Sequence, residues 1–253
     1  MSERRACAAL GLSRAVNRYR SGRSSDEPLR AQLRGLAAQY PRYGYLMRHG
    51  LLKSAGQVVN RKRTYRRYVT EELQVKRRHR KRLDRPRQPL PVPLNANECW
   101  SMDFVSDRLS SGRRLRILNV VGDFTRECAL QVVDYGISGA RITHALAQLA
   151  ESRPLSPVLL CDNGPEFTRK AMFLWTKARG IRLHFIEPGK PIQNAFVESF
   201  NGKFRDARLN QHWFVDLPEA RSAIAGWRIH YNEVRPHSAP GYRPPAVFAR
   251  NAA

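Results

Sequence analysis

Apolar residues recur with two different spacings along the chain, and the change near residue 94 predicts two structural regions. Before residue 94, the apolar residues recur three or four positions apart, as on one face of a helix. One helix is predicted from Pro28 to the residue before Pro41, another over 43–54, and a third after the N-cap residue Asn60. After it, short apolar runs alternate with amphipathic stretches. We therefore expect an all-α region followed by an α/β region.

The α/β region is predicted to begin with a three-stranded meander. Its strands are the run around Trp100–Val105, the run Leu115–Val121 and the run Ala129–Val133, with turns between them. Helices and strands then alternate, in the order helix 138–150, strand 158–161, helix 168–179, strand 182–185 and a helix that carries Glu198. This order is typical of a mixed sheet with helices packed against it.

Three carboxylates occupy positions that ordinary surface carboxylates do not have. Asp103 lies inside the first predicted strand, Asp162 follows an apolar strand and precedes a turn, and Glu198 opens the amphipathic helix. Burying a carboxylate is costly unless it is paired or binds a metal. Three that converge would form an all-oxygen site suited to Mg²⁺ or Mn²⁺. The pattern therefore indicates metal-assisted phosphoryl transfer.

The helix that carries Glu198 has two different faces. Counting 100° per residue places three polar residues near the glutamate, namely Asn194, Asn201 and Arg205. The opposite side holds three phenylalanines, Phe196, Phe200 and Phe204. We expect the aromatic stripe to pack on the sheet and the polar face to line a cleft, where Gly202 permits close approach.

Charge is unevenly distributed along the chain, whose 45 Lys and Arg outnumber its 21 Asp and Glu for a net charge of +24. Residues 1–90 hold 24 basic and 6 acidic residues, a net of +18, whereas residues 91–253 carry a net of +6. This asymmetry indicates a polyanion-binding arm joined to a separate body. A generic cationic surface, as in ribosomal proteins, is the alternative from charge alone.

The helix after Asn60 combines an apolar stripe of Tyr65, Tyr68 and Val69 with basic residues elsewhere. A helix of this kind after a Gly-containing turn fits the second helix of a helix-turn-helix. The alternative is the solvated basic face of a helical bundle. Under the first interpretation five residues contact DNA, namely Arg61, Lys62, Arg63, Arg66 and Arg67. The next segment, 76–93, is cationic and then Pro-rich, which predicts an extended basic linker.

Cysteine usage and apolar content exclude several classes of protein. The four cysteines form no C-x-x-C pair, so we expect neither a zinc site nor a disulfide framework. No apolar stretch approaches the length that spans a membrane, and the first residues lead into no signal sequence. We therefore expect a soluble protein of a reducing compartment, with no membrane as partner.

Six segments together match the motifs of one known family: 100–104, 123–127, 162–167, 188–191, 193–202 and 231–237. In these segments the chain resembles the OrfB-type transposases of bacterial insertion sequences, which have a retroviral-integrase-like core. Thirty-five residues separate Asp162 from Glu198, which is the family's D-D-35-E spacing. Arg205 occupies the basic position seven residues beyond the glutamate. The resemblance covers roughly residues 6–250.

The resemblance implies a ribonuclease-H-like α/β core over 94–250, preceded by a helical, helix-turn-helix region within 1–75. It implies that Asp103, Asp162 and Glu198 form a metal-binding D-D-E triad for Mg²⁺, with Mn²⁺ as a substitute. The implied enzyme is a DNA transposase, a polynucleotidyl transferase that cleaves DNA and transfers strands using two metal ions. The departures from the family pattern are at Gly122, Ala207-Arg208, Pro240 and Leu46-Met47-Arg48.

The expected substrate is double-stranded DNA, both element ends and target, bound by a homo-oligomer in the bacterial cytoplasm in association with the nucleoid. Fusion to, or help from, a protein of an upstream reading frame is left open. Strand phosphates beside the metals would be held by Lys190, Asn194, Asn201, Lys203 and Arg205. Asp123 is expected to stabilise a turn. Two alternatives are a nuclease of the same fold that cuts without joining, and a DNA-binding protein that has lost catalysis.

Overall fold

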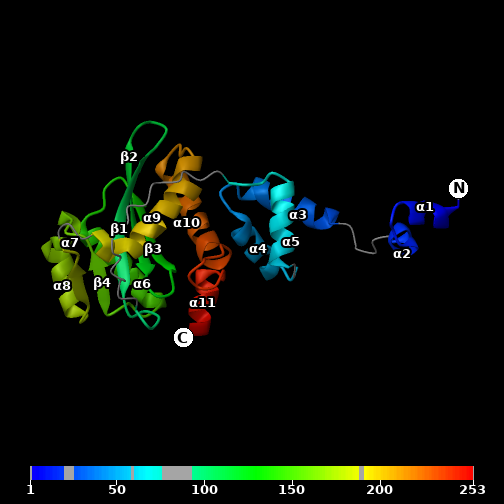
Figure 1. Cartoon of the computed structure of the whole chain (residues 1–253). Coiled ribbons are helices and arrows are strands. Elements are labelled where there is room, and N and C mark those ends of the chain that lie inside the picture. The colour runs from blue at the N-terminus through cyan, green and yellow to red at the C-terminus, as the bar shows by residue number, and fades with distance from the viewer. Residues whose placement is uncertain (1, 20–25, 58–59, 76–92, 188–190, 253) are drawn as a thin grey trace.

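The computed structural model describes residues 2–19, 26–57, 60–75, 93–187 and 191–252. Its first part is all-α, as predicted (Figure 1). The helices of this part are α1 Glu3–Ala9, α2 Arg14–Arg18, α3 Glu27–Gln39, α4 Tyr45–Ser54 and α5 Arg61–Thr70. The predicted linker lies outside the described residues apart from Pro93, and Lys190 lies outside them too.

Helices α3, α4 and α5 form a three-helix unit around a small apolar core. Leu29 and Leu33 of α3 and Leu52 of α4 are buried together. Asn60 caps α5 as predicted, because its side chain accepts a hydrogen bond from the backbone N–H of the second helical residue at 2.8 Å. Gly56 turns the chain between α4 and α5 with a φ of +74°, which glycine adopts without strain.

The apolar stripe predicted for α5 is wrong at two of its three positions. Tyr68 is buried, but Tyr65 is 49% exposed and Val69 is 38% exposed. The buried face consists instead of Tyr68 and Thr64, which lies one turn earlier. The Thr64 hydroxyl is 3.0 Å from Nδ1 of His49 on α4. A hydroxyl suits this interface because the facing helix offers a hydrogen-bonding side chain there.

A five-stranded mixed sheet forms the centre of the second part, with strand order β3-β2-β1-β4-β5 (Figure 1). Its strands are β1 Trp100–Arg108, β2 Arg114–Gly122, β3 Cys128–Asp134, β4 Val158–Cys161 and β5 Arg182–Phe185. The first three pair antiparallel, which confirms the predicted meander. Strand β4 pairs parallel with β1, and β5 pairs parallel with β4, so the predicted mixed sheet is confirmed as well.

Helices cover both faces of this sheet. They are α6 Gly139–Ser152, α7 Pro165–Thr168, α8 Lys170–Ala178, α9 Ala195–Ala207, α10 Leu217–Glu233 and α11 Pro245–Ala252, with 3₁₀ turns η1 Pro191–Asn194 and η2 Leu209–Gln211. One apolar core, which includes Phe200, joins the sheet to α9 and α10. Another, which includes Leu146, joins it to α6, α7 and α8. Within the described ranges, no helix is both long and apolar enough to cross a bilayer.

The predicted helix over 168–179 is confirmed as α8, and a short helix that was not predicted, α7, precedes it. Arg169, between α7 and α8, has an extended backbone with φ of −70° and ψ of 152°. It ends the short α7 and precedes the first residue of α8. Two helices instead of one therefore follow the turn after β4.

The three-helix unit packs against α10 and the segment that follows it, and we call this contact the seam. Tyr43, just before α4, is hydrogen bonded to His230 of α10, with 2.9 Å between the phenol oxygen and Nε2. Tyr40 stacks on both rings, with centroid distances of 4.8 and 5.0 Å. A Cβ on Gly50 of α4 would lie 3.0 Å from Cβ of Pro236. The missing side chain therefore lets α4 approach the α/β part closely.

Candidate active site

The strand pairing brings Asp103 and Asp162 to the same level of the sheet. Strands β1 and β4 run parallel, with Ser101 beside Leu160. Asp103 stands two residues beyond Ser101 on β1 and shares its face, and Asp162 directly follows the last residue of β4, two residues beyond Leu160. These two carboxylates therefore start from neighbouring segments at one level of the sheet.

The Asp103 carboxylate is partly buried and is held by two donors. Its Oδ1 accepts a hydrogen bond from the backbone N–H of Phe104 at 2.7 Å, and its Oδ2 accepts one from Nδ2 of Asn201 at 2.8 Å. Burial first, and then the negative charges of Asp162 and Glu198, raise the pKa of Asp103 to about 6. The three carboxylates therefore interact electrostatically.

Asp162 is held by the turn that follows β4. Its Oδ1 accepts a hydrogen bond from the backbone N–H of Gly164 at 3.0 Å. A Cβ on Gly164 would lie 2.9 Å from that same oxygen and 3.3 Å from Oε2 of Glu166, so the turn has no room for a side chain there. Glu166 forms an ion pair with Arg116 of β2, which ties the turn to the sheet.

Helix α9 has two faces, but Phe196 of the predicted packing stripe is only partly buried. Phe200 and Phe204 are buried beside Trp227 of α10, with ring centroids 5.5 and 4.7 Å from the indole. Glu198 and Arg205 are exposed. The glutamate is thus presented to solvent by a helix that its aromatic residues anchor on the sheet.

A chain of amide hydrogen bonds supports Asp103 from inside the protein, and it was not predicted from the sequence. Gln131 of β3 donates to Asn119 of β2 at 2.8 Å. Asn119, which is fully buried, donates to Asn201 of α9 at 2.7 Å, and Asn201 donates to Asp103. The available signal was a single amide inside the apolar run Leu115–Val121. This amide ladder (Gln131, Asn119 and Asn201) fixes the orientation of the carboxylate.

Other residues predicted beside the carboxylates have different surroundings. Asn194 is buried, and its side-chain nitrogen lies 3.4 Å from the backbone oxygen of Met102, to which it donates. Asn201 is buried in the amide ladder. Lys203 follows Glu198 by five residues, about 140° around the helix, and its charged neighbours are arginines rather than carboxylates. Lys203 therefore lies on another side of α9 than Glu198, and its contact with a strand phosphate stays a prediction.

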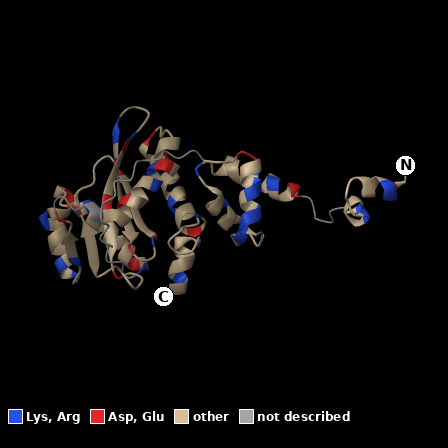
Figure 2. Ribbon diagram, viewed as in Figure 1, with Lys and Arg blue, Asp and Glu red and all other residues tan. Residues whose placement is uncertain are grey.

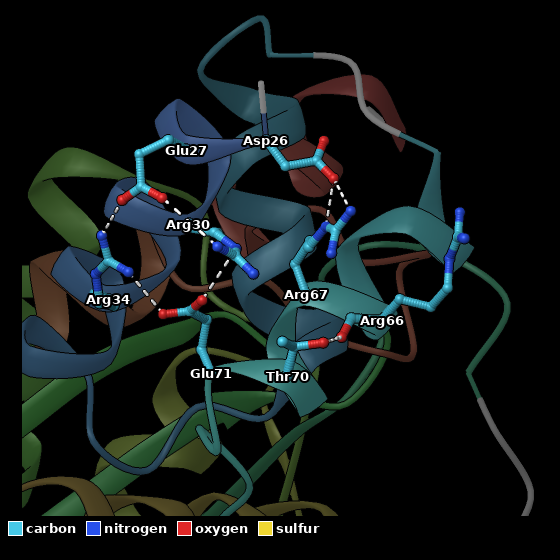
Figure 3. Close-up of polar contacts among 8 residues, drawn as sticks. All are labelled: Asp26, Glu27, Arg30, Arg34, Arg66, Arg67, Thr70 and Glu71. Carbon is cyan, nitrogen blue, oxygen red and sulfur yellow. Dashed lines mark hydrogen bonds and ion pairs between the residues drawn. The ribbon is translucent and has the colours of Figure 1, made fainter. Parts of the chain in front are cut away.

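Lysine and arginine residues gather on α5 (Figure 2). Arg63 and Arg67 both form ion pairs with Asp26, which precedes α3. Figure 3 shows Arg67 turned toward Asp26 and Arg66 pointing away from it. A hollow of about 440 Å³ is lined by Arg61, Lys62 and Arg66 together with Tyr45 and Tyr65. Three of the five predicted DNA-binding residues therefore surround an open cationic and aromatic surface.

A second group of ion pairs joins α3 to the end of α5. Glu71 pairs with Arg30 and Arg34 at 3.1 and 2.7 Å, and Arg34 pairs with Glu27 at 2.5 Å (Figure 3). Arg30 and Arg34 of α3 therefore form ion pairs within the three-helix unit. By contrast, the ion pairs found among the described residues include none of the three cations that line the α5 hollow.

The donor set formed by Asp103, Asp162 and Glu198 is suited chemically to a divalent cation. Carboxylate oxygens are the ligands that Mg²⁺ prefers in proteins. Repulsion among the carboxylates contributes to the raised pKa of Asp103, and a cation between them would relieve it. In the part of the chain that the structure describes, no three His, Cys, Asp or Glu side chains are already grouped closely enough to bind a metal. Binding would therefore require the carboxylates to draw together.

Asp123 has a separate, structural environment. Its carboxylate is buried and accepts a hydrogen bond from the Ser101 hydroxyl at 2.6 Å. Its backbone N–H donates to the oxygen of Cys99 at 3.0 Å. It thus fastens the turn after β2 to the start of β1. The neighbouring Gly122 fits this turn, because a Cβ there would lie 2.8 Å from the hydroxyl of Thr125.

Similar proteins come from insertion elements and retroviruses. Two integrase core domain models match residues 93–191 and 179–245. The chain is 49% identical over 253 residues to the insertion element IS476 uncharacterized 39.2 kDa protein of Xanthomonas euvesicatoria, covering 99% of this chain and 73% of that protein. It is 47% identical over 251 residues to the insertion element IS407 uncharacterized 31.7 kDa protein of Burkholderia multivorans, and this match covers 98% of this chain and 91% of that protein.

A solved structure shares the fold of the second part. The HTLV-2 integrase catalytic core domain, in complex with magnesium in a trimeric form, matches with a TM-score of 0.51. The match covers 62% of this chain and 98% of that one. Since the two sequences are 16% identical, the likeness shows the fold alone.

Proposed function

Since this chain belongs to the insertion-element transposases that have an integrase core, we propose that Asp103, Asp162 and Glu198 are its catalytic, metal-binding carboxylates. Membership confirms the resemblance inferred from sequence, the ribonuclease-H-like fold and the polynucleotidyl transferase class. The observation that carries the residue assignment is the placement of Asp103 on β1 and of Asp162 directly after the neighbouring parallel strand β4, where the charges of Asp162 and Glu198 act on Asp103.

The residues of the proposed site have distinct tasks. Hydrogen bonds from Asn201 and from the backbone of Gly164 orient Asp103 and Asp162, and binding of a metal would draw the carboxylates together. Glu198 completes the set from α9. A divalent metal, Mg²⁺ or Mn²⁺ in its place, would supply positive charge to the attacking and leaving oxygens of the phosphoryl transfer. The remaining work is positioning of the strands.

Double-stranded DNA, as element ends and as target, is the proposed substrate. Its backbone would lie on the exposed cations of α5, which we propose as the second helix of a helix-turn-helix. Arg63 and Arg67 would contact a phosphate only by exchanging Asp26 for it. Arg205 is exposed near Glu198 and would hold a phosphate beside the carboxylates. Contacts by Lys190, Asn194 and Asn201 stay predictions.

The proposed organisation is a helical DNA-binding region over 1–75, a linker over 76–93 and the catalytic core over 94–250. The protein would act as a homo-oligomer on DNA, in the bacterial cytoplasm and near the nucleoid. A partner from an upstream reading frame is proposed as an alternative means of completing the complex.

Replacing Asp162 by Asn tests the proposed site. The amide keeps the shape of the side chain but loses the charge that would hold a metal, so cleavage and strand transfer should be abolished. Folding and duplex binding should be retained. Asp107→Asn is the matched control. The Asp107 carboxylate accepts a hydrogen bond from the backbone N–H of Arg108, so this variant should have activity like that of the wild type. Wild-type catalysis by the Asp162 variant in Mg²⁺ would disprove the assignment.

The same assay separates the two alternative functions. Supplying a pre-cut end with a free 3′-hydroxyl tests joining without cleavage. A nuclease would cut intact ends and fail to join pre-cut ones. A DNA-binding protein without catalysis would bind the ends and do neither in Mg²⁺ or Mn²⁺.

A further inference from the structure

On the side of α9 away from Glu198, three cations gather around the neutral imidazole of His237 into what we call the cationic cluster: Arg126, Lys203 and Arg235, with His237. They come from the β2–β3 turn, from α9 and from the segment after α10. The guanidinium of Arg126 lies 3.6 Å from the ring centre of Phe196, which is only partly buried. The His237 ring lies edge-on to Tyr231, with centroids 4.4 Å apart.

The deepest members of the cluster have polar atoms without partners. Arg235 is 9% exposed, and its Nε and Nη1 are buried without a hydrogen bond. His237 is 5% exposed, and its Nε2 is also buried and unpartnered. Such atoms are rare in folded proteins, because each loses its hydration without replacement. They indicate a missing hydrogen-bonding ligand.

The cations of the cluster, Arg126, Lys203 and Arg235, also have no ion-pair partner among the described residues. Burial, reinforced by the neighbouring arginines, lowers the pKa of Lys203 to about 8. Burial and the nearby Lys203 and Arg235 lower the pKa of His237 to about 3. The charge of Asp123 acts on Arg126, but this carboxylate accepts a hydrogen bond from the Ser101 hydroxyl.

We propose that the cationic cluster binds a phosphate of the DNA backbone, at a site distinct from the carboxylates and from α5. Arginine and lysine donors together suit a phosphate, which accepts several charge-assisted hydrogen bonds. The Arg235 guanidinium also lies 5.0 Å from the ring centre of Tyr43, so the bound phosphate sits beside the seam. This inference rests on the proposed function, since that function supplies the DNA.

The seam explains why DNA is the occupant. Tyr43 belongs to the unit that carries α5, and Lys203 belongs to the helix that carries Glu198. A strand that reaches from the α5 surface to the carboxylates has to pass between these two parts of the molecule. A phosphate bound to the cationic cluster would hold that strand between the α5 surface and the carboxylates. The unpartnered Nε and Nη1 of Arg235 are then satisfied only when DNA is aligned with both parts.

The test compares Lys203→Met with Lys177→Met in full-length protein that also carries Asp162→Asn. Methionine keeps the length of the side chain but removes its charge, and Lys177 is an exposed residue of α8 on the other face of the sheet. Duplex affinity is measured across a salt series without metal. Loss of one phosphate contact should weaken binding several-fold and flatten the slope of log K against log salt by about 0.9. The Lys177 variant should match its parent.

A second measurement distinguishes a binding role from a merely structural one. Removing one charge from the uncompensated cluster should leave the DNA-free melting temperature unchanged or raise it. Inorganic phosphate, against chloride at equal ionic strength, should raise the melting temperature of the parent more than that of the Lys203 variant. A parental salt slope for Lys203→Met, or a large fall in its DNA-free melting temperature, would overturn the site. If no protein in the series binds duplex DNA, both the site and the proposed function fail.

Discussion

At Asp103, orientation comes from the amide ladder, and Asn119 is its central residue. Replacing Asn119 by Leu removes the partner of Gln131 Nε2 and of Asn201 Oδ1, so Asn201 is free to turn away from the carboxylate. We expect strand transfer to fall about 10–100-fold, with more Mg²⁺ needed for half-maximal rate, because groups behind metal ligands have effects of this size. The measurement is the rate across a magnesium series.

Val132→Ala is the control for that change. Val132 is a buried residue of β3 that lies outside the amide ladder, and its truncation costs about 1–2 kcal/mol of the free energy of unfolding. The Asn119 variant should lose about 1–3 kcal/mol through its unpaired amides. Only the Asn119 variant should change the magnesium dependence. Equal magnesium dependence in the two variants would reduce the ladder to a purely structural role.

The raised pKa of Asp103 predicts how stability depends on pH in metal-free protein. Between the ordinary aspartate pKa and about 6, the folded state binds one more proton than the unfolded state. The free energy of unfolding should therefore fall as pH rises through this window, by up to about 3 kcal/mol for two pKa units. Denaturation with urea in EDTA from pH 4 to pH 7 measures it. Asp103→Asn should lose this part of the slope, and an unchanged slope would contradict the assigned pKa.

On the scale of a single helix, α5 divides its arginines between internal pairing and open surface. Arg66→Ala should weaken duplex binding and flatten the slope of log K against log salt by about 1, because its cation is free to meet a phosphate. Arg63→Ala should flatten it less, because Arg63 is paired with Asp26. Salt titrations of both variants decide between them. A larger change for Arg63 would mean that DNA displaces Asp26.

The sequence predicts elements well where local periodicity determines them. The two faces of α9 follow from residues three and four apart, so Phe200 and Phe204 are assigned correctly to the buried side. The meander is likewise visible in short apolar runs. The α5 stripe fails because the facing residue, His49, decides which side chain is buried, and His49 lies 15 residues earlier in the chain.

Polar positions at the candidate site are harder to predict than the carboxylates. Asp103 and Asp162 stand out because they interrupt or end apolar strands. Asn201 is recognisable as a residue of the Glu198 face, but its contacts with Asn119 and Asp103 span 82 and 98 residues. No local pattern contains such pairings. For the same reason the position of Lys203 depends on Arg126 and Arg235, which only the folded chain brings near.

For the whole molecule, the closeness of the seam can be tested with two glycines. Gly35 of α3 has open space where a Cβ would lie, so Gly35→Ala should raise the free energy of unfolding by roughly 0.5–1 kcal/mol through helix propensity. Gly50→Ala should gain less or lose stability, since the new methyl group presses on Pro236. Thermal denaturation compares the two.

The Gly50 variant should also separate binding from catalysis. Duplex affinity should stay near that of the parent, because the α5 surface is untouched. Strand transfer should fall, because the new methyl group shifts α4 relative to α10. Equal gains in stability for both alanine variants, with unchanged strand transfer, would show that the seam tolerates displacement.

The seam formed by Tyr43, His230 and Pro236 fixes the distance between the three-helix unit and the α/β part of the protein. With the three-helix unit seated on α10, the span from α5 to Glu198 is set by the folded chain and not by the DNA. If α5 contacts the element end and Glu198 lies at the reacting phosphate, as proposed, the bond that is cut is chosen by its distance from the DNA that α5 contacts. B-form DNA turns once in about 10–10.5 base pairs. About five extra base pairs between the DNA that α5 contacts and the bond that is cut would therefore present the opposite side of the duplex to the carboxylates. In an element that such a protein binds, the number of base pairs between the contacted sequence and the end of the element would therefore be constant.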